Sequence, residues 1–258
     1  MKRNLPRISL ITPSYNQAKF IEKTINSVLS QKYPNLEYIV MDGGSDDGTV
    51  EILKKYNEKI IWYSRKDKGQ TDAINAGIKK STGEMIGYLN SDDILFPKAL
   101  HNVANFFQQN SNCYWVTGRC QIINEQDNIV RSFITSYKNF WLKYARNYTS
   151  LTIINYISQP ATFWRREVVE SIGFFDQSLF YAMDYDYWLR ISKIYRLGFI
   201  DDYLAAFRIQ KKAKSYLDSN SLLEEGYYVA KRYSQFPFPF FHKIHDLFTM
   251  ITYQIFKK

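Results

Sequence analysis

The sequence predicts an α/β fold with a parallel sheet, because apolar runs of strand length alternate with amphipathic helices along its first half. The four apolar runs are residues 7–13, 36–42, 59–63 and 85–90. The segments that carry the helical pattern are residues 17–31, 49–56 and 70–81. In such a sheet, ligands are expected at the carboxyl ends of the strands.

The pattern changes after residue 95. Pro97 suits the first turn of a helix that extends to about Gln109. The remaining predicted elements are two or three strands within 114–134, a strand at 161–165, a helix at about 184–196 and a strand at 202–209. Residues 137–158 are irregular and rich in Tyr, Asn and Thr, and we expect them to line a site. Residues 217–258 are predicted to be helical apart from a break at 236–239.

Composition limits the classes of partner. The 34 Lys and Arg residues exceed the 25 acidic ones, which gives a net charge of +9, but they are spread along the chain rather than gathered in a basic tract. This pattern argues against a nucleic-acid partner. The two cysteines lack the spacing of a zinc site. The chain has no signal peptide and no apolar run of 18 residues, so we expect a cytoplasmic protein or one held at the inner face of the membrane.

Polar residues follow three of the predicted strands directly. They form the clusters Thr12–Asn16, Asp42–Gly48 and Asn90–Asp93. If these strands are neighbours, the clusters meet on one rim. An aromatic ring, an isolated acid, a glycine turn and an acid pair together suit a base, a ribose and a metal-bound diphosphate. Each cluster taken alone could simply make a turn.

The first strand is not followed by G-x-G-x-x-G, and no G-x-x-x-x-G-K-[ST] occurs, so no glycine loop is available to hold a diphosphate. The charge of a diphosphate must then be offset in another way. A divalent cation held by a carboxylate pair does this, since Mg²⁺ and Mn²⁺ prefer oxygen ligands. The adjacent acids Asp92 and Asp93 are the candidate metal ligands.

Four segments in order resemble the family-2 glycosyltransferases of the GT-A fold. They are residues 8–49, residues 67–93, QPATFWRREVVESIGFFD from Gln159 and MDYDYWLRI from Met183. The resemblance implies a mixed central sheet in a catalytic domain of residues 1–215, followed by a helical extension of 216–258. The nucleotide-binding half would be about 1–95 and the acceptor half about 96–215.

The resemblance also implies an activity. The protein would be an inverting, metal-dependent glycosyltransferase that moves a sugar from a nucleotide donor, typically UDP-linked, to a saccharide or lipid-linked acceptor. Surface polysaccharide biosynthesis is the expected context, and Mn²⁺ or Mg²⁺ the expected cofactor. The alternative is a catalytically inactive relative that binds a nucleotide sugar or a glycan.

Carried over position by position, the resemblance implies roles for individual residues. The nucleotide and donor residues would be Pro13, Tyr15, Asp42, Asp67, Asp72, Asn90 and Asp92. Asp92 and Asp93 would hold the metal, with Gln159 and Trp188 on the acceptor side and Asp184 as the general base. The chain departs from the family pattern at three positions, with Asn90 for an acid, Met183 for a Glu before the base, and Gln210 where many relatives have His.

Two assignments stay open at the level of sequence. Asp184 begins a predicted helix and could cap it, and Asp186 competes with it for the catalytic role. The segment 236–258 is aromatic, approximates one apolar helical face and ends in two lysines. It can dock on the core or lie on an anionic membrane, and we favour peripheral membrane contact.

Overall fold

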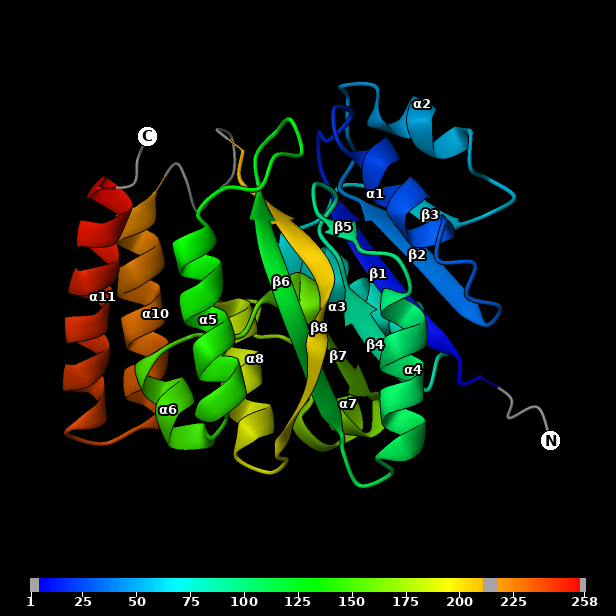
Figure 1. Cartoon of the computed structure of the whole chain (residues 1–258). Helices are drawn as coiled ribbons and strands as arrows, with labels where there is room; N and C mark the ends of the chain where they lie inside the picture. Colours follow the sequence, from blue (N-terminus) through cyan, green and yellow to red (C-terminus); the bar gives the residue numbers. More distant parts are fainter. Residues whose placement is uncertain (1–4, 211–217, 256–258) are drawn as a thin grey trace.

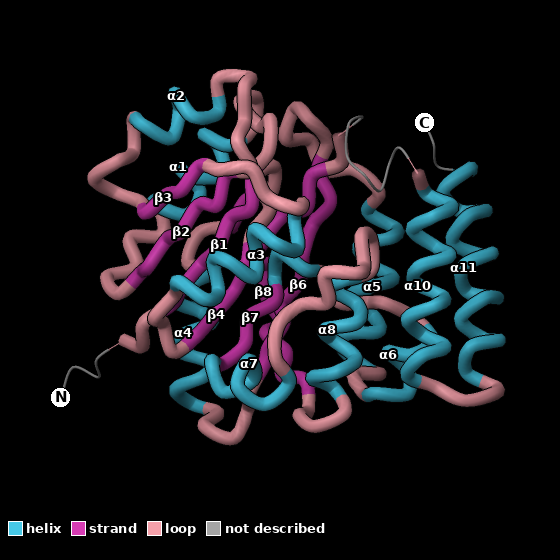
Figure 2. Tube along the Cα trace, turned by 180° about the vertical axis from the view of Figure 1, so that it is seen from behind, coloured by secondary structure: helices cyan, strands magenta, loops and turns pink. Residues whose placement is uncertain are grey.

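The computed structural model describes residues 5–210 and 218–255. Its centre is a mixed sheet of eight strands in the order β3-β2-β1-β4-β7-β6-β8-β5 (Figures 1 and 2). The strands are β1 (Ile8–Ser14), β2 (Leu36–Asp42), β3 (Ile61–Ser64), β4 (Met85–Tyr88), β5 (Ile94–Leu95), β6 (Trp115–Ile123), β7 (Thr162–Arg165) and β8 (Leu197–Arg208). The sheet and its covering helices confirm the predicted α/β class with a mixed sheet.

The first half of the chain forms a parallel sheet, as the alternating pattern predicts. β1 lies between β2 and β4 and is buried along its whole length. The helices of this half are α1 (Ile21–Leu29), α2 (Thr49–Lys54), α3 (Gln70–Lys80) and α4 (Ala99–Gln109). Gly77 lets α3 approach the sheet closely, because a Cβ added there would lie 2.5 Å from Cγ2 of Ile11. The carboxyl ends of β1, β2 and β4 therefore share one edge.

The second half departs from the prediction between residues 124 and 158. β6 is a single strand, after which only one isolated bridge, Ile123 to Ile129, forms before a helix begins. The predicted extra strands in 114–134 are therefore wrong. Residues 137–158, expected to be irregular, fall largely in α5 (Ser132–Tyr144) and α6 (Tyr148–Ile153). α5 contains many residues with low helix propensity. Its helical form buries Thr135 and Leu142.

The remaining elements follow β6 in the second half of the chain. They are η1 (Gln159–Ala161), α7 (Arg166–Ile172), α8 (Met183–Ser192), α10 (Ser219–Tyr233) and α11 (Phe238–Ile255). α10 and α11 run side by side at the end of the molecule remote from β3 (Figure 2), with α10 packed on α8 and α11 on α6. The predicted domain boundary at 215/216 lies outside the described residues.

Candidate active site

A cavity of about 1140 Å³ opens at the carboxyl edge of the parallel strands. All three polar clusters predicted to share a rim contribute to its wall, through Tyr15 after β1, Gly43 after β2, and Asn90 and Asp92 after β4. The cavity continues past Asp184 at the start of α8 to the helices of the C-terminal extension. One continuous space thus joins the strand edge to the second half of the chain.

The strand-edge end of the cavity has an aromatic ring and an acid. Pro13 lines it at the end of β1, and Tyr15 beyond it is 61% exposed. Asp67 also lines it and accepts a hydrogen bond from the N–H of Gly69 at 2.8 Å. Gly43 allows this placement, because a Cβ there would lie 2.9 Å from Oδ2 of Asp67.

Two of the acids assigned to the nucleotide lie outside the cavity wall. Asp42 is 2% exposed, and its Oδ2 accepts hydrogen bonds from the N–H groups of Gly44 and Ser45 and from the hydroxyl of Ser64, at 2.6–3.1 Å. Asp72 accepts from the N–H of Lys68. In this arrangement Asp42 shapes the glycine turn that lines the cavity, and its contact with a base stays a prediction.

The turn after β4 is held by an amide network. Asn90 Oδ1 accepts from Gln70 Nε2 at 2.7 Å, and Asn90 Nδ2 lies 3.3 Å from both Asp93 Oδ2 and Gln159 Oε1. Gln159 in turn donates to the carbonyl of Tyr88. Asn90 therefore lines the cavity as a neutral linker between α3 and η1, where the family pattern has an acid.

The two adjacent acids of this turn have different surroundings. Asp92 lines the cavity and accepts a hydrogen bond on Oδ2 from Gln210 Nε2 at 2.6 Å. Asp93 is fully buried, is absent from the cavity wall and accepts from the N–H of Arg208 at 2.8 Å. Asp92 is thus the member of the pair that a ligand in the cavity can reach.

The charge of this pair is poorly balanced by the protein. Burial raises the pKa of Asp92, and burial together with the charge of Asp92 raises the pKa of Asp93 well above its usual value. The charge of Arg208 lowers the pKa of both acids, but its guanidinium also pairs with Asp127. Within the described residues no three acidic, His or Cys side chains form a metal cluster. The carboxylates of this pair can therefore hold a divalent cation only if diphosphate oxygens supply further ligands.

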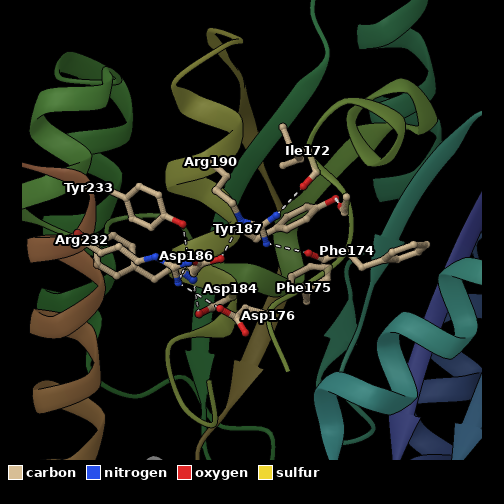
Figure 3. A network of polar contacts seen from close by, with 12 residues as sticks. Ile172, Phe174, Phe175, Asp176, Asp184, Asp186, Tyr187, Arg190, Arg232 and Tyr233 are labelled. Carbon is tan, nitrogen blue, oxygen red and sulfur yellow. Dashed lines mark hydrogen bonds and ion pairs between the residues drawn. The ribbon is translucent and has the colours of Figure 1, made fainter. Parts of the chain in front are cut away.

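The structure distinguishes the two acids at the start of α8. Asp186 is 1% exposed, and its carboxylate binds Arg190 Nε at 2.8 Å and the Tyr233 hydroxyl at 2.7 Å (Figure 3). Arg190 also donates to the carbonyls of Ile172 and Phe174. Asp186 therefore joins α8 to α10 and to the end of α7.

Asp184 is left facing the cavity. Its Oδ1 accepts from the N–H of Tyr185 at 2.7 Å, and no hydrogen bond from the described residues reaches Oδ2. Burial raises the pKa of Asp184, while Lys138 of α5 acts in the opposite direction. Lys138 lines the same cavity and donates to the carbonyl of Ile157 at 3.3 Å. A carboxylate with a raised pKa and a free oxygen can accept a proton from a bound hydroxyl.

At the far end of the cavity, polar side chains lie among apolar ones. Two buried polar atoms of its lining residues have no hydrogen-bond partner among the described residues: Thr135 Oγ1 and Asn155 Oδ1. Burial lowers the pKa of His245 to about 4 and raises that of Asp246 to about 7. Unpaired buried polar groups of this kind suit a ligand rich in hydroxyl groups.

The acceptor-side assignments separate in the structure. Gln159 lines the cavity, whereas Trp188 is fully buried and stacks on Trp115 at 5.9 Å. Trp188 therefore belongs to the aromatic core under α8. The residues that sequence reasoning missed, Lys138, Asn155, His242 and His245, come from α5, the loop after α6, and α11. Their only signal was an isolated charge or amide among aromatic residues, which does not single out a site.

Comparison with known proteins identifies the family. The glycosyl transferase family 2 model matches residues 9–173. The chain is 30% identical over 201 residues to an uncharacterized glycosyltransferase of Rickettsia typhi, which covers 76% of this chain and 63% of that protein. It is 28% identical over 197 residues to the chondroitin synthase of Escherichia coli, 74% of this chain and 27% of the synthase. The chain thus spans less than two thirds of the length of either relative.

Solved structures share the fold. A mannosyltransferase of Pyrobaculum calidifontis, in complex with GDP-Man and Mn²⁺, matches with a TM-score of 0.69 and 20% identity, over 95% of this chain and 69% of that chain. TarS of S. aureus (residues 1–349), in complex with UDP-GlcNAc, matches with a TM-score of 0.66 and 20% identity, over 86% of this chain and 65% of that chain. The family model matches residues 9–173, and the solved structures have the same fold. The chain therefore belongs to glycosyl transferase family 2 and has the GT-A fold.

Proposed function

We propose that the protein is an inverting, metal-dependent glycosyltransferase that moves a sugar from a UDP-linked donor to a saccharide or lipid-linked acceptor during surface polysaccharide assembly. The observation that carries this proposal is the single cavity that joins Asp92 at the strand edge to the free oxygen of Asp184. The E. coli relative, a chondroitin synthase, supports the polysaccharide context.

Each end of the cavity has a task in this reaction. Tyr15, Asp67 and the Gly43 turn would hold the nucleotide, and Asp92 would hold Mn²⁺ or Mg²⁺ at the diphosphate. A bound cation would offset the charge of the departing diphosphate. Asp184 would take the proton of the acceptor hydroxyl as it attacks the sugar from the face opposite the diphosphate, which inverts the anomeric centre. The unpaired polar atoms beyond Asp184 would bind the acceptor.

A donor screen tests this proposal. UDP-, GDP-, CMP- and dTDP-linked sugars are mixed with the protein with and without Mn²⁺, and both thermal stabilisation and release of the nucleotide are measured. We expect a UDP-sugar to give the largest metal-dependent response, although the P. calidifontis structure holds GDP-Man. Stabilisation without turnover of any donor, even with saccharide acceptors present, would favour the inactive relative instead.

A peripheral membrane contact is the second part of the proposal. Four exposed side chains form an apolar stripe along α11: Phe240, Phe241, Ile244 and Leu247, each 44–58% exposed. The opposite side of the helix packs inward, where His242 is buried and stacks on Tyr185. The helix thus docks on the core with one face and leaves the other uncovered, so both sequence alternatives have support. No helix in 5–210 or 218–255 is long and apolar enough to cross a membrane.

The triple variant Phe240→Ser, Ile244→Ser and Leu247→Ser should weaken binding to vesicles that contain anionic lipid by at least about tenfold. Each side chain stabilises an apolar contact by about 1.5–3 kcal/mol when fully buried, so the loss of three is large even at partial insertion. Vesicle co-sedimentation measures the effect. The control is Ile194→Ser, which removes an apolar side chain of 58% exposure from the region after α8. Equal vesicle binding by the triple variant and the parent would refute the contact.

A further inference from the structure

The segment before α8 is held by a side chain of the C-terminal extension. Glu225 of α10 accepts hydrogen bonds from the N–H groups of Phe180 at 2.9 Å, Tyr181 at 2.5 Å and Ala182 at 2.6 Å. Ala182 is the N-cap of α8, and no side chain of the segment itself caps that helix. Asp184 follows two residues later. A carboxylate more than forty residues away in the sequence therefore fixes the backbone that leads to the candidate base.

We propose that Glu225 is a positioning residue for Asp184: its carboxylate clamps the N–H groups of residues 180–182 and so sets where the base enters the cavity. The inference rests on the proposed function, because it assigns a task within the same site. It also gives the C-terminal extension a part in catalysis, since the clamp belongs to α10.

The clamp is well suited to hold a base. Three N–H groups converge on one carboxylate, and hydrogen bonds to an ionised acceptor are about twice as strong as those between neutral groups. Without Glu225, these amides lose partners that the rest of the segment does not replace, and the segment gains freedom. A shift of about 1 Å in a reacting group can cost about 10²-fold in rate. The clamp should therefore act on turnover rather than on donor binding.

Glu225 also acts on Asp184 through its charge. Several titratable groups surround that carboxyl: Lys138 from α5, Glu225 from α10, Tyr88 from β4 and, further along the same cavity, His242, His245 and Asp246 from α11. Burial is the main cause of the raised pKa of Asp184, Glu225 raises it further and Lys138 lowers it. Loss of Glu225 and loss of Lys138 should therefore move this pKa in opposite directions.

The experiment compares Glu225→Ala, Glu225→Gln and the neighbouring control Glu224→Gln, which changes an exposed residue of the same helix. Hydrogen exchange of a peptide covering 177–183 measures the clamp without any substrate. We expect faster exchange in Glu225→Ala, an intermediate rate in Glu225→Gln, which keeps one acceptor oxygen, and the parent rate in Glu224→Gln. UDP release from the donor selected in the screen should fall roughly tenfold in Glu225→Ala, with the donor KM within about twofold of the parent's.

A titration separates positioning from general loss of structure. The Asp184 carboxyl carbon is followed by ¹³C NMR and identified by its absence in Asp184→Asn. In Glu225→Gln its pKa should fall, and in Lys138→Met it should rise. The acidic limb of kcat/KM should move with it, because the base works only when ionised.

Unchanged exchange at residues 177–183 in Glu225→Ala would overturn the clamp. An unchanged Asp184 pKa in Glu225→Gln would show that the charge of Glu225 does not act on Asp184. Faster exchange in Glu225→Ala with unchanged turnover would show that Glu225 holds the segment but does not position Asp184, and would overturn the proposal. If the parent turns over no donor, the proposed function fails by itself, while the exchange and NMR measurements still decide whether Glu225 positions Asp184.

Discussion

Replacing Asp184 by Asn is expected to lower sugar transfer by about 10²–10⁴-fold, the usual effect of losing a positioned proton acceptor. Binding of the nucleotide should stay near the parent's, because the base is needed only in the transition state. Asn keeps the size of the side chain and can still accept from the N–H of Tyr185. The measurement is steady-state transfer together with the Kd for UDP in the presence of Mn²⁺.

The same variant should not lose stability, and the pH dependence of its melting temperature gives a sign that can be checked. The folded pKa of Asp184 is raised by burial, so ionisation of this carboxyl opposes folding. Asn resembles the protonated form. The Tm of Asp184→Asn should therefore equal the parent's below the ordinary pKa of an Asp. It should rise above the parent's as the pH passes the raised value.

Asp186→Asn is the matched comparison and should give the opposite result. Both oxygens of Asp186 are engaged, by Arg190 and Tyr233, and the loss of a hydrogen bond to a charged group costs about 1.5–3 kcal/mol. We expect a lower Tm and a transfer rate per folded molecule close to the parent's. If Asp186→Asn abolishes transfer while Asp184→Asn transfers at the parental rate, Asp186 is the base and the assignment made from the cavity is wrong.

The two acids show how far the sequence alone reaches. Helical spacing places Asp184 and Asp186 in the first turn of α8, and the family resemblance favours Asp184. The reason that Asp186 cannot serve as a free base is its contact with Tyr233, which lies in another helix 47 residues further on. No local pattern contains that contact. The sequence identifies the two candidate acids, but it does not show that Asp186 has a structural role.

The parallel half of the sheet was predictable because its signal is local and repeated. β1, β2 and β4 are buried on both faces and each ends in polar residues, so their limits and the shared edge follow from the pattern. α5 was not predictable in this way. Its sequence is rich in aromatic and β-branched residues that favour strands, and its helical state accompanies burial of Thr135 and Leu142.

The far end of the site was hidden for the same reason. Lys138 of α5 and His242 of α11 reach one cavity from segments about a hundred residues apart, and neither belongs to a motif. Trp188 shows the converse error. Its place four residues after Asp184 puts it near the candidate base along the helix, yet its ring packs against Trp115 and Trp164 in the core. Spacing along a helix gives the face of a residue but not what covers that face.

Replacing Asp92 by Asn is expected to remove most of the metal-dependent part of the thermal stabilisation that UDP gives. Ligand present at about 100 times its Kd stabilises a protein by about 2.7 kcal/mol, so a metal that tightens UDP binding gives a measurable rise in Tm. Asp92 is the acid of the pair that lines the cavity, and Asn there can still accept from Gln210 Nε2. The variant therefore removes the charge while the turn keeps its hydrogen bond.

Asp93 provides the comparison that shows which of the two acids holds the metal. Both acids were expected to hold the metal, but Asp93 is fully buried and accepts from the N–H of Arg208. Asp93→Asn should therefore keep a metal response, because Asp93 does not line the cavity, whereas Asp92→Asn should lose the response. Asp46→Asn removes one negative charge from the exposed turn after β2 and serves as the control for net charge. A full response to Mn²⁺ in Asp92→Asn would show that the cation, if it binds, is held elsewhere. Loss of the response in Asp93→Asn alone would return the metal to the buried acid and require the turn after β4 to open when UDP binds.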